Sequence, residues 1–420
     1  MVVRADGSSF WDAEGREYLD FASQLVATNL GHGNVAVQQA IAQQARTLPY
    51  IAPAFATEAR AQLSGALLRV LPPGLDRFFF STSGTEANEA ALRIARALTG
   101  RSKVLANEIS YHGATAGALS VSGDLRRTAA GPGSEVPGTV FVPNCYCYRC
   151  PLSLTYPGCH VACADEVERA IEQNSDVAAM ILEPVVGTNG VIVPVPEYLP
   201  KVRAITRRHG ILLVADEVMT GWGRTGAWFA VQRFGIAPDI LTTAKGITGG
   251  YAPLALTATT RMLFEHFRDH YLPVGHTYEA HPVALAAGVA AIGEYERLGL
   301  IEKSRRDGEY LLDRLREVGA RHPSVGDVRG VGLFAAVELV RDRARKSPFN
   351  TPEDKWHGRP LVVEEVAARM RSEGVYVLPW VNHLILAPPL IVTREEIDRG
   401  VSALDRALLP CDERAAAASG

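Results

Sequence analysis

The sequence predicts an α/β protein with a large, mostly parallel sheet and a smaller α+β domain. Apolar strand-like runs alternate with amphipathic helical stretches through the middle of the chain, which is the pattern of parallel βαβ units. These runs are almost continuously apolar, as expected where helices cover a sheet on both faces. A chain of 420 residues, 47% hydrophobic and 21% charged, is long enough for both domains.

The predicted elements follow one another in a regular order. The chain opens with a hairpin, since strand-like residues 9–12 and 18–21 flank a turn at residues 13–15. The remaining expected elements are strands at 78–80, 104–106, 177–182, 211–215, 240–243 and 254–258, helices at 81–96, 197–209, 261–269, 282–297, 301–318, 364–371 and 394–408, and strand-like alternation over 325–339.

Both ends of the chain are expected to build the small domain. The C-terminal part mixes helical and strand-like segments, and we expect it to share a layer with the N-terminal hairpin. The predicted boundaries are residues 1–45 for the N-terminal part of the small domain, 46–285 for the large domain and 286–420 for the C-terminal part.

The charge and hydropathy of the chain exclude several kinds of partner. A net charge of −3 gives no reason to expect binding to nucleic acid or to an anionic membrane. No apolar run approaches the length of a membrane span, and the N-terminus lacks the apolar core of a signal peptide. We therefore expect a protein of the cytoplasm whose partners are small molecules.

Five of the six cysteines fall in one stretch, at positions 145, 147, 150, 159 and 163. Their spacing approaches that of a zinc site, but the two pairs lie unusually close together in the sequence. Disulfides are disfavoured in a reducing cytoplasm. We expect free buried thiols rather than a metal site.

Lys245 differs from the other lysines because it follows an apolar, Thr-lined run and precedes a glycine-rich turn. Earlier in the chain, Asp216 ends the apolar run 211–215. A lysine that forms a Schiff base and an aspartate that pairs with a protonated pyridine nitrogen are what pyridoxal phosphate requires. Taken alone, Lys245 is better explained as a surface lysine at a strand end, so other motifs must decide.

Small residues between a strand and a helix form a candidate phosphate site. Gly84 and Thr85 follow the apolar run 78–80 and open a helix, where backbone N–H groups and the helix dipole favour an anion. A plain helix cap explains the same residues, since Ser and Thr are common there. Thr277, which precedes another helix start, is either a further phosphate contact or a turn residue.

Two further strand ends carry candidate ligand-binding residues. Tyr111 and His112 follow the strand at 104–106, and Glu183 follows the strand at 177–182. Ligands of α/β proteins bind in the crevice at the carboxyl ends of parallel strands. An aromatic ring at this position is suited to stacking on a flat cofactor, and a carboxylate is suited to orienting a group in the site. The alternatives are a half-buried loop tyrosine and a solvated acid.

In this order, the motifs resemble those of the class III (ω-type) pyridoxal-phosphate aminotransferases of fold type I. The resemblance extends over residues 4–408. It rests on Ser-Gly-Thr-Glu-Ala at 83–87, Tyr-His-Gly at 111–113, Glu-Pro at 183–184, Asp-Glu-Val at 216–218, Gly-Trp-Gly-Arg-Thr-Gly at 221–226, Lys-Gly at 245–246, His-Thr-Tyr at 276–278 and Pro-Pro-Leu at 388–390.

The resemblance implies a role for each motif. It makes Lys245 the Schiff-base lysine, which also moves a proton between the substrate carbon and the aldehyde carbon of the cofactor. It makes Asp216 the partner of the pyridine nitrogen. The further contacts that it implies for pyridoxal 5′-phosphate are Tyr111 and Val218 on the two ring faces, Gly84 and Thr85 at the phosphate, His112 and Glu183 nearby, and Thr277 from the other subunit of a homodimer.

The chain also departs from the pattern of the family on the substrate side. Relatives that act on α-carboxylate substrates often carry an arginine just before Pro-Pro-Leu, where this chain has Ile385. A carboxylate prefers a bidentate guanidinium, so that clamp is missing. Many amine transaminases carry a tryptophan near the start, where Val26 is expected to leave a wider pocket. The other candidate substrate residues are His276, Trp380, Asn382 and His383, for which loop packing is an equally good explanation.

These features predict an aminotransferase that works by a ping-pong mechanism. The amino group would move between an amine, an ω-amino acid or an amino sugar and a keto or aldehyde acceptor. Among the candidate donors, the missing clamp favours a diamine or an amino sugar of the aminoglycoside type over an ω-amino acid or a taurine-like compound. The alternatives are an aminomutase or lyase acting on an amino sugar with the same cofactor, and a catalytically silent protein that binds the cofactor as a regulator or partner.

Overall fold

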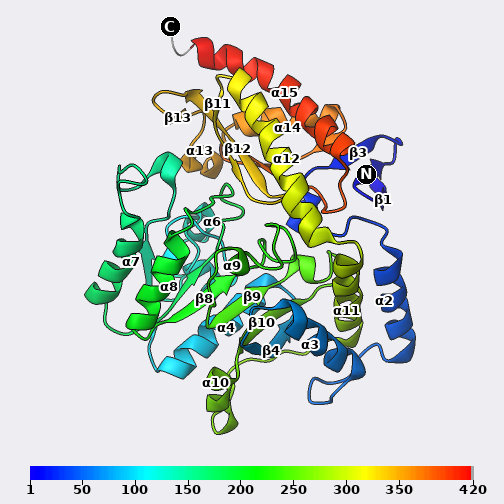
Figure 1. Ribbon diagram of the computed structural model, residues 1–420, viewed down its shortest axis with the longest axis vertical. Helices are drawn as coiled ribbons and strands as arrows, with labels where there is room; N and C mark the ends of the chain where they lie inside the picture. Colours follow the sequence, from blue (N-terminus) through cyan, green and yellow to red (C-terminus); the bar gives the residue numbers. More distant parts are fainter. Residues whose placement is uncertain (418–420) are drawn as a thin grey trace.

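The computed structural model describes residues 1–417, and its centre is a 7-stranded sheet with the order β4-β10-β9-β8-β7-β5-β6 (Figure 1). The strands are β4 (Leu75–Ser81), β5 (Lys103–Asn107), β6 (Thr139–Val142), β7 (Val177–Leu182), β8 (Leu212–Asp216), β9 (Ile240–Thr243) and β10 (Ala255–Thr260). The mixed sheet and helices confirm the predicted α/β class.

All strands of this sheet except β10 point the same way. Strands β6, β5, β7, β8 and β9 pair in parallel along the sheet. Strand β10 is antiparallel to both of its neighbours, β9 and β4, so β4 shares the direction of β9. The sequence predicted the strand at 254–258 but not its direction. The carboxyl ends of β4, β5, β7, β8 and β9 therefore lie along one edge.

Helices cover both faces of the sheet, and the strands alternate between them. On β7, Ile181 packs with Val214 of β8 in a cluster that includes the apolar side of α4 (Gly84–Thr99). The next residue, Leu182, belongs to the opposite face, in a cluster with Leu199 of α8 (Tyr198–Arg208). Burial on both faces explains why these strands are apolar without interruption, since each buried aliphatic side chain stabilises the fold by roughly 1.5–3 kcal/mol.

The remaining helices of this part surround the sheet and its loops. They are α1 (Ser23–Val26), α2 (Val35–Thr47), α3 (Glu58–Val70), α5 (Ala116–Ser120), α6 (Leu125–Ala129), α7 (Ala162–Gln173), α9 (Ala230–Arg233), α10 (Arg261–Phe264) and α11 (Pro282–Arg297), with short 3₁₀ turns η1 (Cys147–Arg149), η2 (Lys245–Ile247) and η3 (Glu265–Arg268). Over the described residues, no helix combines the length and apolarity needed to span a membrane.

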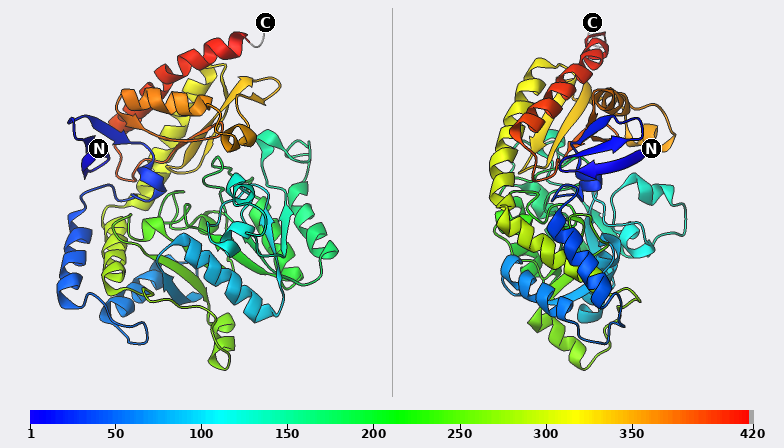
Figure 2. Two further views of the ribbon diagram at one scale, coloured as in Figure 1. Left: turned by 180° about the vertical axis from the view of Figure 1, so that it is seen from behind. Right: turned by 90° about the vertical axis from the view of Figure 1, so that its right-hand side faces the viewer.

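Two smaller sheets lie above the large one, and one of them joins the two ends of the chain (Figure 2). One contains β1 (Val2–Asp6), β2 (Ser9–Asp12), β3 (Glu17–Asp20) and β14 (Val375–Tyr376), and β14 pairs in parallel with β3. The predicted shared layer of hairpin and C-terminal segment is confirmed by this pairing. The domain boundaries at 45 and 285 stay a prediction.

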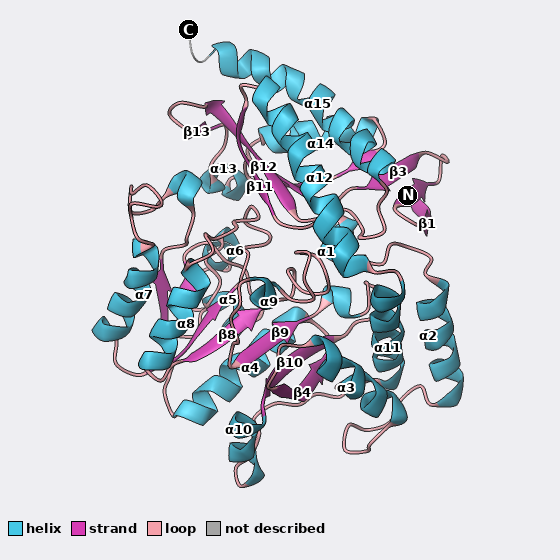
Figure 3. Cartoon of the chain, viewed as in Figure 1, coloured by secondary structure: helices cyan, strands magenta, loops and turns pink. Residues whose placement is uncertain are grey.

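The second small sheet carries the helices of the C-terminal part (Figure 3). Its order is β11-β12-β16-β15, with β13 beside β12. The elements are β11 (Val325–Gly330), β12 (Ala335–Asp342), β13 (Ser347–Pro348), β15 (Leu378–Trp380) and β16 (His383–Leu386), with helices α12 (Leu300–Arg321), α13 (Pro352–Trp356), α14 (Val362–Ser372) and α15 (Arg394–Ala417). Strand β16 pairs with β12, and the turn before β16 lines a pocket together with loops of the large domain.

Candidate active site

The carboxyl edge of the large sheet gathers the residues that the sequence singled out. Asp216 is the last residue of β8, and Lys245 follows β9 after a single alanine. Glu183 comes directly after β7, the loop after β5 carries Tyr111 and His112, and Gly84 opens α4 after β4. Because these strands point the same way, the backbone alone brings the residues together.

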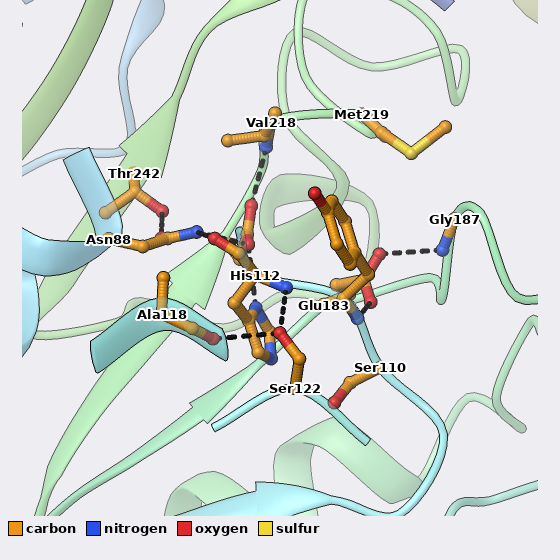
Figure 4. A network of polar contacts seen from close by, with 12 residues as sticks. Asn88, Ser110, His112, Ala118, Ser122, Glu183, Gly187, Val218, Met219 and Thr242 are labelled. Carbon is orange, nitrogen blue, oxygen red and sulfur yellow. Dashed lines mark hydrogen bonds and ion pairs between the residues drawn. The ribbon is translucent and has the colours of Figure 1, made fainter. Parts of the chain in front are cut away.

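The carboxylate of Asp216 is held by a buried network of polar partners, which are Asn88, His112 and Val218 (Figure 4). Asn88 donates to it over 2.8 Å, and the backbone N–H of Val218 donates over 3.0 Å. The Nδ1 atom of His112 lies 2.8 Å from the same carboxylate. Asn88 is itself fixed, because its side-chain oxygen accepts from the Thr242 hydroxyl at 2.6 Å. The carboxylate therefore has a fixed position and is 3% exposed.

Lys245 combines an unusual backbone with a perturbed amine. Its φ of +49° lies in the left-handed region that non-glycine residues rarely occupy. Burial lowers the pKa of Lys245 to about 8, although the charges of Asp216 and Glu183 act in the opposite direction. The residue as a whole is only partly exposed, in keeping with the desolvation that lowers its pKa. A lysine with this pKa holds more of the neutral, nucleophilic amine near neutral pH than an ordinary lysine does.

Glu183 ties two loops of the edge together. Its carboxylate accepts from the backbone N–H of Tyr111 at 2.9 Å and from that of Gly187 at 2.8 Å (Figure 4). Burial raises the pKa of Glu183 to about 7, while a positive charge on His112 would lower it. The contact fixes the backbone of Tyr111, and thus the position from which its ring projects.

The turn from β4 into α4 is shaped to receive an anion. Ser83 and Glu86 form a capping box, while the N–H groups of Gly84 and Thr85 have no acceptor among residues 1–417. A Cβ atom at Gly84 would lie 2.8 Å from a methyl carbon of Val218, so the loop after β8 closes against this turn. Helix α4 also directs the positive end of its dipole here.

These groups together fit pyridoxal phosphate. The α4 turn suits its phosphate, the Asp216 carboxylate suits a protonated pyridine nitrogen, and the Lys245 amine suits its aldehyde carbon. The Nε2 atom of His112 is buried and has no partner within the described chain, so the polar network around Asp216 is incomplete without a further group. The fold and this edge define a pyridoxal-phosphate-dependent enzyme of fold type I.

The comparisons with known proteins give the family. The chain belongs to the class-III aminotransferases, whose family description matches residues 1–408. It is 39% identical to the taurine–pyruvate aminotransferase of Rhodobacter capsulatus, over 97% of this chain and 91% of that one. It is 36% identical to the adenosylmethionine-8-amino-7-oxononanoate aminotransferase of Geobacter sulfurreducens, over 97% and 91%.

A solved structure extends the comparison to three dimensions. Taurine:2-oxoglutarate aminotransferase from Bifidobacterium kashiwanohense, solved with pyridoxal phosphate and glutamate, superposes with a TM-score of 0.92. It is 36% identical and covers 98% of this chain and 93% of its own. These comparisons confirm the resemblance found in the sequence. The chain is a pyridoxal-phosphate-dependent aminotransferase.

Three of the predicted substrate residues lie together in a pocket of about 360 Å³ between the large sheet and the small domain. Trp380 lines it from β15, His383 from β16, and Asn382 from the turn between these strands. The Trp380 indole N–H donates to the side-chain oxygen of Asn189 at 2.9 Å. The loop after β7, which carries Asn189, thereby contacts the small domain.

Glu338 organises this pocket and was missed in the sequence. It is fully buried and accepts hydrogen bonds from Tyr146, from Arg149 at 2.5 Å and from Arg329 at 2.8 Å, and it faces His383 at 3.1 Å. Burial acts to raise the pKa of Glu338, but His383 and Arg329 outweigh it and hold that pKa well below its usual range. The sequence does contain a signal that could have identified Glu338, because it is a charged residue inside the apolar run 333–340.

Two residues at which the chain departs from the family pattern, Val26 and Ile385, lie in the core and not in this pocket. Val26 and Ile385 are each 2% exposed and belong to one apolar cluster with Phe334 and Val185. Trp380 packs against the edge of this cluster. Neither Val26 nor Ile385 lines the pocket of Trp380, so whether Val26 widens it stays a prediction.

His276 and Thr277 lie away from that pocket. The Nε2 atom of His276 is 3.9 Å from a carboxylate oxygen of Glu86, and its ring packs edge-on against Phe79. This places it near the N-terminus of α4. Thr277 is exposed, and its backbone oxygen accepts from the Tyr50 hydroxyl at 3.0 Å.

The cysteine-rich stretch forms a small pocket of its own. Cys145, Cys147, Cys150, Cys159 and Cys163 all line it, and all are free thiols. The prediction of buried thiols is right for Cys145 and wrong for Cys147, which is exposed because it starts the short η1 turn at the surface. The hydrogen bond with Cys163 raises the pKa of the Cys145 thiol. The expectation that no metal binds here stays a prediction.

Proposed function

We propose that this edge of the sheet holds pyridoxal 5′-phosphate and that the chain moves an amino group from a primary amine to a keto or aldehyde acceptor in two half-reactions. The observation that carries the proposal is the placement of a desolvated Lys245 beside the fixed carboxylate of Asp216 at one sheet edge. When bound, the cofactor supplies an electron sink for the pair of electrons left on the substrate carbon.

The residues divide the work between binding and proton transfer. Lys245 would hold the cofactor at its aldehyde carbon, and its amine would move a proton to and from the substrate carbon. Asp216 keeps the pyridine nitrogen protonated, and His112 holds Asp216. The remaining proposed contacts are Gly84 and Thr85 with the phosphate, Tyr111 and Val218 with the ring faces, and Glu183 with the loop of Tyr111.

We also propose a homodimer in which Thr277 reaches the phosphate of the partner's site. In support, Thr277 is exposed next to the exposed aromatics Tyr50 and Tyr278. The centroids of these two rings are 6.4 Å apart. Exposed aromatic side chains in one place are typical of a protein interface. A cytoplasmic location stays a prediction from the sequence.

The proposed donor is a small ω-amino acid or a taurine-like compound. This choice follows the names of the relatives, among them the taurine–pyruvate enzyme of Rhodobacter capsulatus. It replaces the sequence-based preference for a diamine or an amino sugar. That preference rested on the missing arginine at position 385. Because Ile385 lies in the core and does not line the pocket, this position gives no reason to prefer a donor without an acidic group.

Lys245→Ala tests the proposal most directly. Without the amine, we expect loss of the Schiff-base absorbance and a drop of at least 10³-fold in every half-reaction, measured by stopped-flow absorbance with a panel of amines. Lys103→Ala, at the start of β5, is the matched control and should keep both signals.

The products distinguish the alternatives. Release of a keto product together with the aminated cofactor supports transfer, whereas an isomerised or cleaved amine without the aminated cofactor indicates an aminomutase or lyase. A loaded wild-type protein that reacts with no amine would instead be a binding protein. Full activity of Lys245→Ala would rule the proposal out.

A further inference from the structure

Arg126 lies between two aromatic rings at the mouth of the proposed cofactor site. It is the second residue of α6, and its guanidinium carbon is 4.5 Å from the ring centroid of Tyr111 and 4.1 Å from that of Trp380. Tyr111 belongs to the cofactor edge, and Trp380 belongs to the substrate pocket. A flat guanidinium stacked against such rings keeps a defined orientation.

Two arginines act on Lys245 from nearby, and their hydrogen bonding differs. The charges of Arg126 and Arg224 both contribute to the lowered pKa of Lys245, after burial. Arg224 is fully buried, and its two terminal nitrogens donate to the backbone oxygens of Leu333 and Pro388 and to side chains of Ser23 and Asn29. Those bonds hold protein segments together and leave Arg224 no free terminal nitrogen for a ligand.

Arg126, in contrast, has an open edge. Its Nη1 donates to Asp124 at 2.9 Å, while Nε and Nη2 have no acceptor in the part of the chain that the structure describes. The Asp124 side chain is fully buried and also accepts from the backbone N–H of Arg126 at 2.7 Å, so it fixes the orientation of the guanidinium. The Arg126 side chain is 34% exposed, so part of it is accessible to solvent.

The free edge has the geometry of an oxyanion site. The Nε and Nη2 atoms of a guanidinium donate in parallel to two oxygens of one carboxylate or sulfonate. Position 385, where relatives carry a clamp arginine, is occupied by a core isoleucine that offers no donor. We infer that Arg126 binds the carboxylate or sulfonate of the amine donor and so selects acidic donors. This inference rests on the proposed function, because it concerns the donor of that same site.

The test compares Arg126→Met with Arg127→Met, its neighbour on α6. Arg127 pairs with Glu135 and stacks on Phe141, away from the Tyr111 and Trp380 rings. With β-alanine and with taurine we expect kcat/KM to fall by on the order of 100-fold in Arg126→Met, since an ionic hydrogen bond is lost. With n-butylamine, a donor of similar length that lacks an acidic group, kcat/KM should change less than about threefold. Arg127→Met should match wild type with all three donors.

A binding measurement separates recognition from turnover. Propionate and ethanesulfonate carry the acidic group without an amine, so they cannot react. Titration calorimetry with the cofactor-loaded protein should show their Kd rising on the order of 100-fold in Arg126→Met and not in Arg127→Met. A loss for taurine but not β-alanine would assign the site to sulfonates, and the reverse to carboxylates; either supports the inference.

Three results would overturn the inference and leave the proposed function intact. The first is an equal loss of kcat/KM for donors with and without an acidic group, and the second is unchanged kinetics with acidic donors. The third is loss of cofactor absorbance in Arg126→Met, which would show that the residue has a structural role. A wild-type protein that converted no amine would instead defeat the proposed function. Propionate binding would then still decide whether Arg126 holds an anion.

Discussion

The cofactor side and the substrate side of this site are built in different ways. On the cofactor side, Asp216, Glu183 and Lys245 stand at the ends of neighbouring strands, and the shared strand direction brings them together. On the substrate side, Trp380 and Glu338 come from the small domain and meet loops of the large domain only through side chains. A site with one backbone-defined wall and one side-chain-defined wall can keep its chemistry while its choice of substrate varies.

After removal of Lys245 itself, the largest effect is expected from the cofactor side of the site, in Asp216→Asn. Asparagine keeps the shape but removes the charge that pairs with the pyridine nitrogen. We expect the half-reaction rate to fall by about 10²- to 10³-fold, the usual cost of removing one electrostatic stabiliser. Cofactor occupancy, measured by absorbance, should persist because Lys245 and the α4 turn are intact.

The same variant makes a pH prediction. The Asp216 charge raises the pKa of Lys245 against the effect of burial, so removing it should lower that pKa. Attachment of the cofactor needs the neutral amine, and its rate in wild type should rise with pH through about 8. The midpoint in Asp216→Asn should lie at lower pH. A midpoint that stays fixed would mean that the two groups do not interact.

A smaller effect on chemistry and a larger one on stability are expected from the substrate wall, in Glu338→Gln. The change removes the buried charge that pairs with Arg149 and Arg329 and leaves Arg329 only its contact with Asp327, which should cost about 2–4 kcal/mol of unfolding free energy. KM for the amine should rise, because Arg149 and His383 line the pocket. The Schiff-base absorbance should stay, and denaturant titration and steady-state kinetics measure the two effects.

The same variant also makes a prediction about how stability depends on pH. The folded-state pKa of Glu338 lies below the unfolded value. Its stabilising effect is therefore complete above the unfolded pKa, about 4.3, and is lost as pH falls through the folded one. Wild type should lose stability on acidification below about pH 4 more steeply than Glu338→Gln. If wild type and Glu338→Gln lost stability equally steeply, another group would be responsible for the loss in acid.

The difference between the walls also explains what the sequence could predict. Tyr111, Glu183 and Asp216 belong to three different strand ends, yet all three were expected near one edge because a parallel sheet aligns its strand ends. Tyr146 and Glu338 are 192 residues apart, and no comparable rule pairs a loop of one domain with a strand of another. The reversed direction of β10 and the buried positions of Val26 and Ile385 likewise depend on tertiary packing.

The smallest effect is expected where the backbone itself forms the wall, in Gly84→Ala. The φ of Gly84 suits any residue, so only space is tested: the new Cβ would lie 2.8 Å from a methyl carbon of Val218. We expect the affinity for pyridoxal phosphate to fall about tenfold, the low end of the cost of overpacking. Equilibrium dialysis against the apoprotein measures it.

Two partner variants sharpen this last test. Val218→Ala removes both crowding methyl groups, so the double variant should recover part of the affinity lost in Gly84→Ala, despite the smaller contact with the ring face. Gly65→Ala, in the middle of α3 where a Cβ meets nothing within 4 Å, should instead stabilise the fold by roughly 0.5–1 kcal/mol. If Gly84→Ala behaved like Gly65→Ala, the α4 turn would not approach the cofactor, and the phosphate would have to bind at another helix terminus.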